Sequence, residues 1–124
     1  MLGEWEGLNA EEIEARGDAE LLRQYRLSPH GQRPPGGETL DAAWARMMRV
    51  RDEISLAHPT GHIAVVGHGG TLRALLCAAL DAPVSSMLRF ALANASLSII
   101  EETRYEQNFH RRVLSVNDTA HLIC

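Results

Sequence analysis

The chain has 124 residues, of which 45% are hydrophobic and 5% aromatic, so a single core is feasible and must rest on aliphatic side chains. A formal net charge of -4 without a basic cluster argues against nucleic acid or an anionic membrane as a partner. No apolar run approaches the ~20 residues that a membrane helix needs, and the first residues carry no signal-peptide pattern. Two cysteines, Cys77 and Cys124, do not suggest a disulfide framework. We therefore expect a cytoplasmic protein.

Two short helices are predicted near the start of the chain. Asn9, followed three residues later by Glu12, has the spacing of a capping box, and Gly17 ends the helix that they begin. Asp18 is a candidate cap for a second helix. The stretch from Ser28 to Gly37, which includes His30, holds three prolines and three glycines and is predicted to be a loop.

A long helix is predicted from Glu38 until His58-Pro59 closes it. Its apolar face is marked by residues at helical spacing, namely Leu40, Trp44, Met47, Val50 and Ile54.

The run from Ile63 to Val66 is short, apolar and rich in β-branched residues, which predicts a strand covered on both faces. Helical spacing of leucines follows, until Asp81 stops the pattern. Between the two, Gly69 and Gly70 let the backbone bend tightly and bring N–H groups close to a ligand at the positive end of a helix dipole. His68 lies at this turn, outside the carboxyl end of a strand, where open α/β sheets bind ligands.

This turn has two interpretations. In one, His68, Gly69 and Gly70 bind an anion such as phosphate. In the other, His68 is a hydrogen-bonded structural residue beside an ordinary glycine turn.

The end of the chain predicts an antiparallel hairpin. Ser96 to Glu101 and Arg111 to Val116 have the composition of strands, and the polar stretch from Arg104 to Asn108 joins them. We find no internal repeat and no boundary for a second domain, so residues 1–124 are expected to form a single domain.

Other candidate residues carry weaker signals. Trp5 is either a core anchor or a wall of the site mouth. Glu38 is either a general acid or a favourable charge in a first helical turn. Arg73 follows the glycines closely and can add positive potential there. His58 and His62 have a metal-like spacing, but a proline and a glycine between them make a shared face improbable, so no metal site is expected.

Five segments resemble, in chain order, the histidine phosphatase superfamily and most of all its phosphoglycerate mutase-like branch. They are Leu2–Leu8, Pro34–Leu40, Val65–Leu76, Asn94–Ser98 and Val116–Leu122. The resemblance implies a three-layer α/β/α fold with a mostly parallel sheet and a C-terminal antiparallel hairpin. It also implies phosphoryl transfer through a phosphohistidine, with phosphate or a small phosphomonoester as ligand, His68 as the second imidazole of the pocket, and no cofactor.

The family's Arg-His-Gly motif, whose histidine becomes phosphorylated, does not occur in these 124 residues. The segment with a second phosphate-binding arginine and the upstream proton-donor glutamate are also missing. We therefore expect the C-terminal portion of a phosphatase or mutase, an incomplete domain that is inactive alone. The alternatives are a non-catalytic anion-binding or assembly module, and one part of a split enzyme that another chain completes.

In the family fold, the strand before the nucleophile lies beside the strand that corresponds to Ile63–Val66. Without that neighbour, one edge of this apolar strand has no hydrogen-bonded partner, and natural proteins rarely leave such an edge exposed. A two-fold homodimer that buries this edge is expected. The alternative is a monomer in which Met1 to Leu8 cover the edge.

Overall fold

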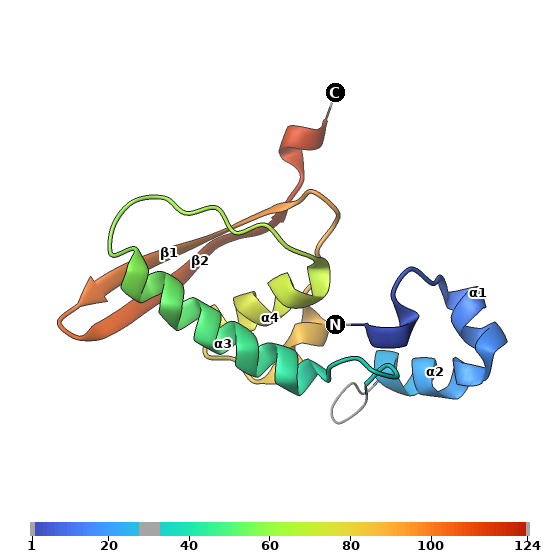
Figure 1. Ribbon diagram of the computed structural model, residues 1–124. Helices are drawn as coiled ribbons and strands as arrows, with labels where there is room; N and C mark the ends of the chain where they lie inside the picture. The colour runs from blue at the N-terminus through green and yellow to red at the C-terminus, as the bar shows by residue number, and fades with distance from the viewer. Residues whose placement is uncertain (1, 28–32, 124) are drawn as a thin grey trace. The chain divides into compact units, whose positions relative to one another are not determined.

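The computed structural model describes residues 2–27 and 33–123 (Figure 1). The chain folds into two compact units, Met1–Ala45 and Arg46–Cys124. His30, the first part of the predicted loop and Cys124 lie outside the described residues. No helix in the described ranges is long and apolar enough to cross a membrane.

The first unit begins with the 3-10 turn η1 (Gly3–Trp5), the helix α1 (Ala10–Ile13), the π-helical segment η2 (Glu14–Asp18) and the helix α2 (Ala19–Leu27). The predicted capping box is confirmed, because Asn9 Oδ1 accepts from the Glu12 amide at 2.8 Å and the Glu12 carboxylate accepts from the Asn9 amide at 3.0 Å. Gly17 adopts a φ of +96° between α1 and α2, as its predicted role as a helix end requires.

Trp5 is the core anchor of this unit. Its side chain is 2% exposed and packs with Ile13 and Leu22, while its ring meets Tyr25 edge-on at a centroid distance of 6.0 Å. The indole N–H donates to the Asp18 carboxylate at 2.9 Å, which satisfies the polar atom of a buried ring. Asp18, which the sequence predicted as a cap, thus binds the core tryptophan.

The second unit holds most of the helix α3 (Leu40–Ala57), the helix α4 (Gly69–Ala79) and the 3-10 segments η3 (Val84–Arg89) and η4 (Ala120–Leu122). The strands β1 (Leu97–Tyr105) and β2 (Asn108–Asp118) pair antiparallel, so the predicted hairpin is confirmed. Its strands extend further than predicted, because Arg104 and Tyr105 pair with Phe109 and Asn108 and only two residues remain for the turn.

The structure is mixed α/β, but it corrects the expected sheet. The described residues contain one two-stranded antiparallel sheet, and Ile63–Val66 do not pair with any strand. Ile63 and Val65 are each 45% exposed and Val66 is 94% exposed, so the prediction of a buried strand was wrong. A parallel strand needs a hydrogen-bonded neighbour, and none of the described residues supplies one.

Gly3 lies against a tight turn at residues 34–37. The Glu4 amide donates to the Pro35 carbonyl at 2.7 Å, and the Gly37 amide closes the turn on the Pro34 carbonyl at 2.8 Å. A Cβ atom at Gly3 would overlap Gly37 N and Pro35 O, and Gly3 has a φ of +55°. Only glycine fits this position without a shift of the backbone.

We predict that Gly3→Ala destabilises the fold by about 2–4 kcal/mol, since strain at positive φ adds to a clash with backbone atoms. Gly7→Ala is the matched control, because Gly7 also has a positive φ, of +80°, but its Cβ would meet nothing within 4 Å. This control should lose only about 1 kcal/mol. Urea unfolding followed by tryptophan fluorescence measures both losses, and equal losses would show that the close approach is unimportant.

Candidate functional site

His68 is the N-cap residue of α4. Its backbone is extended, with φ -96° and ψ 159°, and the helix begins at the next residue. Its carbonyl accepts from the Leu72 amide at 2.9 Å and from Thr71 Oγ1 at 3.1 Å. These bonds fix the main chain of His68, whereas its imidazole makes no capping hydrogen bond and is exposed. The predicted position of the histidine at a helix start is confirmed.

The amides of Gly69, Gly70 and Thr71 form the first turn of α4 and have no acceptor among the described residues. Unpaired N–H groups at a helix start attract anions, since they carry the positive end of the helix dipole. A Cβ atom at Gly69 would meet nothing within 4 Å, so the space beside this turn is open. The turn can therefore accept an anion next to the imidazole.

Gly67 contributes to the packing around the first turn of α4, and sequence reasoning missed this role. A Cβ atom there would lie 3.4 Å from Leu72 Cδ2 and from Thr71 Oγ1, whereas one at Gly69 would meet nothing. Gly67 therefore lies within ordinary van der Waals range of the first turn of α4, whereas Gly69 faces open space. The only sequence signal for it was a third glycine on the other side of His68.

Packing of α4 fixes where this helix start lies. Its buried residues are Ala74, Leu76, Cys77, Ala78 and Ala79. Burial also raises the pKa of the Cys77 thiol, as expected for a structural cysteine.

Arg51 holds the other end of α4. Its Nη1 donates to the Ala78 carbonyl at 2.6 Å and pairs with Asp81 at 2.9 Å. Although burial disfavours its charge, the hydrogen bonds that Arg51 donates to Asp52 and Asp81 raise the pKa of Arg51. A cation at a helix C-terminus is electrostatically favourable and satisfies a terminal carbonyl.

The remaining predicted site residues differ in their placement. Arg73 lies in α4 itself, partly buried, and has no ion pair among the described residues. Trp5 is in the core of the first unit, as described above. Glu38 lies before α3, because Thr39 Oγ1 accepts from the Ala42 amide at 3.1 Å and the helix begins at Leu40. The acidic residue in the first turn is Asp41, so the interpretation of Glu38 as a first-turn charge was wrong.

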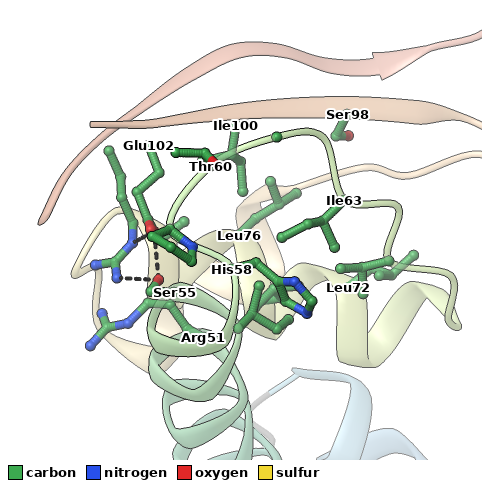
Figure 2. Close-up of a pocket in the computed structure, with 17 residues that line it drawn as sticks. Arg51, Ser55, His58, Thr60, Ile63, Leu72, Leu76, Ser98, Ile100 and Glu102 are labelled. Carbon is green, nitrogen blue, oxygen red and sulfur yellow. Dashed lines mark hydrogen bonds and ion pairs between the residues drawn. The ribbon is translucent and has the colours of Figure 1, made fainter. Parts of the chain in front are cut away.

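A second polar cluster, which sequence reasoning missed, lies in the second unit at one end of a cavity of about 330 Å³ that polar and apolar residues line together (Figure 2). Ser55 Oγ donates to the Glu102 carboxylate at 2.7 Å, and Arg111 binds both, with Nε 2.7 Å from Glu102 and Nη2 3.1 Å from Ser55 Oγ. The Arg111 side chain is 9% exposed and that of Glu102 is 29% exposed. The cluster therefore ties both strands of the hairpin to α3.

We predict that Glu102→Ala destabilises the protein by about 2–3 kcal/mol, because it leaves the Arg111 guanidinium largely buried without its carboxylate. Ser55→Ala removes a neutral partner only and should cost about 1 kcal/mol. The control is Glu101→Ala, since Glu101 pairs with Arg112 on the same hairpin at 2.6 Å but with side chains 43% and 62% exposed. That loss should stay under about 0.5 kcal/mol. Thermal unfolding checks the order, and equal losses at Glu101 and Glu102 would contradict it.

Comparison with known proteins gives consistent matches over most of the chain. The chain is 32% identical over 122 residues to phosphoserine phosphatase 1 of Hydrogenobacter thermophilus, a match that spans 97% of this chain and 54% of that protein. It is 40% identical over 76 residues to 2,3-bisphosphoglycerate-dependent phosphoglycerate mutase 2 of Gloeobacter violaceus, spanning 60% of this chain and 34% of that one. The chain thus spans about half, or less, of the length of these relatives.

A solved mycobacterial structure, glucosyl-3-phosphoglycerate phosphatase in complex with VO3, is similar with a TM-score of 0.74 and 26% identity. The similarity spans 95% of this chain and 60% of that one. The sequence pattern of the histidine phosphatase superfamily (branch 1) matches residues 1–117. The chain therefore belongs to the histidine phosphatase superfamily, with phosphatases and phosphoglycerate mutases among its relatives.

Proposed function

We propose that these 124 residues supply the second-histidine side of a phosphate pocket in a phosphatase or phosphoglycerate mutase. The observation that carries the proposal is His68 at the N-cap of α4, beside three amides without an acceptor among the described residues. The ligand is phosphate or a small phosphomonoester. Arg73 adds positive potential, and no metal or cofactor takes part.

The chemical role of His68 in this proposal is electrostatic. In the family's reaction, a different histidine attacks phosphorus and becomes phosphorylated, and water or a second hydroxyl then takes the phosphoryl group. His68 and the Gly69 and Gly70 amides donate to the equatorial oxygens of the transferred group, where negative charge is concentrated. Fixing these donors before the reaction lowers its barrier, since no reorganisation is needed.

The attacking group itself lies outside these residues in our proposal. The sequence holds no Arg-His-Gly segment, so we propose that the chain is inactive alone and corresponds to the C-terminal portion of the family domain. In that view the two compact units belong to one three-layer α/β/α domain, whose parallel sheet needs strands from the rest of the fold. A non-catalytic anion-binding module and a split enzyme remain the competing proposals.

We also propose that the isolated chain is a two-fold homodimer in the cytoplasm. The support is the exposed apolar run Ile63–Val66, since exposed strand-like segments without partners associate readily. This proposal concerns assembly and does not depend on the role of His68.

We predict that the 124-residue chain does not measurably hydrolyse p-nitrophenyl phosphate, because the covalent route requires a nucleophile that is absent. A colorimetric assay with a complete histidine phosphatase as positive control measures this. Metal-independent turnover that His68→Ala abolishes would contradict the proposal.

We predict further that phosphate or vanadate shifts the amide resonances of Gly69, Gly70 and Thr71 in NMR spectra. His68→Ala should weaken binding about tenfold, because it removes a donor to the anion. The matched control is His110→Ala, at an exposed position of strand β2, which should leave the shifts unchanged. Anion shifts elsewhere in the chain that His68→Ala does not affect would refute the site.

A further inference from the structure

A turn at residues 93–96 precedes strand β1 and is held by side chains from the end of β2 and from η4. The Ser96 amide closes the turn by donating to the Ala93 carbonyl at 3.1 Å. The Ala93 amide donates to Asn117 Oδ1 at 2.7 Å, and His121 Nε2 lies 2.8 Å from the Ala95 carbonyl oxygen. The turn is thus fastened at two points by residues that follow 24 and 26 positions later in the sequence.

The backbone of this turn is strained at Ala95. This residue has a φ of +59°, in the left-handed region, which its Cβ atom disfavours. Asn117 has a φ of +60°, but asparagine tolerates that conformation. Other non-glycine residues keep it only where the surroundings impose it, and such residues are frequent at ligand sites. At Ala95, these surroundings include the amide of Ser96 and the imidazole of His121.

The bond to Ala95 fixes the hydrogen on the imidazole of His121. A carbonyl oxygen can only accept, so Nε2 carries a hydrogen and donates it. The neutral ring with its hydrogen on Nε2 and the imidazolium can both make this bond. A glutamine side chain also ends in an N–H donor, whereas alanine has none.

The turn before β1 lies at the same end of the second unit as His68. The cavity of this unit is bounded by β1 and by the segment that leads to His68. In Figure 2, Ser98 of β1 lies over Ile63 of that segment, whereas Glu102 lies nearer to Thr60. The two stretches therefore run in opposite directions, and β1 begins where the other stretch ends. Figure 1 agrees, because the chain that enters β1 passes the first turn of α4.

We infer that His121 is a positioning residue for the anion site at His68, and that the turn it holds is the wall of this site on the side of β1. The inference rests on the function proposed above and adds a wall to that site. The amides of Asn94 and Ala95 have no acceptor among the described residues, so the turn offers further donors to an oxyanion. His121 acts through the turn and not on the ligand.

The contribution of His121 to binding is the order that it gives the turn before the anion arrives. A loose turn has to be ordered during binding, and the lost conformational entropy lowers the affinity. With the hydrogen bond in place, this cost is met during folding.

The test is a phosphate titration of the 124-residue chain followed by NMR, with two variants at one position. His121→Ala should weaken phosphate binding about fivefold, the scale of one neutral hydrogen bond, and should accelerate hydrogen exchange of the Ser96 amide. His121→Gln keeps an N–H donor and should restore both quantities to within about twofold of those of the unmodified chain. Without phosphate, the Gly69 and Gly70 resonances should coincide in all three proteins, since the start of α4 is intact.

Asp118→Ala is the matched control, because the Asp118 carboxylate accepts from the Ala120 amide at 2.9 Å, a bond that stays within the C-terminal segment. This variant should keep the original phosphate affinity. Unchanged affinity in His121→Ala would overturn the inference alone, as would weakening without faster exchange at Ser96. Equal weakening in the glutamine variant or in Asp118→Ala would overturn it too. If phosphate does not shift the resonances of the α4 N-terminus in the unmodified chain, both the proposed function and this inference are wrong.

Discussion

Burial of one face of α4 is the interaction on which the arrangement of the second unit depends. The residues that carry it are small or aliphatic, and Ala74, Cys77 and Ala78 are fully buried. Small side chains let neighbouring elements approach α4 closely, so its axis is held firmly. Arg51 binds the Ala78 carbonyl in the last turn of α4 and the Asp81 carboxylate that follows the helix. With the body and the C-terminal end of the helix held, the position of its first turn is determined as well, and with it the position of His68.

The same rigidity supports the proposed role of His68, although its side chain is exposed. The carbonyl of His68 is bound twice, at Leu72 and Thr71, and Gly67 passes close to both of these side chains. Only the rotation of the imidazole remains free. A site built on the end of a packed helix is more exact than one built on a loop, which suits a group whose proposed role is to stabilise charge in a fixed direction.

Local signals explain which parts of the fold could be predicted. The Asn9–Glu12 capping box, the start of α4 after His68 and the hairpin each depend on residues close together in the sequence, and the structure confirms them. The prediction of a buried strand at Ile63–Val66 was wrong, because a strand depends on a neighbouring strand that its own sequence does not reveal. The Ser55–Glu102–Arg111 cluster was missed because its members are 47 and 56 residues apart, with no pattern to link them. Likewise, Glu38 was predicted to lie in the first turn of α3, but the helix begins two residues later, at Leu40.

The central claim is that His68 binds phosphoryl oxygens and is not the group that attacks phosphorus. Its most direct test is mass spectrometry of the chain after incubation with acetyl phosphate, under alkaline conditions that preserve phosphohistidine. The account predicts that all six histidines of the sequence stay unmodified, while phosphate still shifts the resonances of the α4 N-terminus. A phosphohistidine at His68 would contradict the account, since it would make this residue the nucleophile.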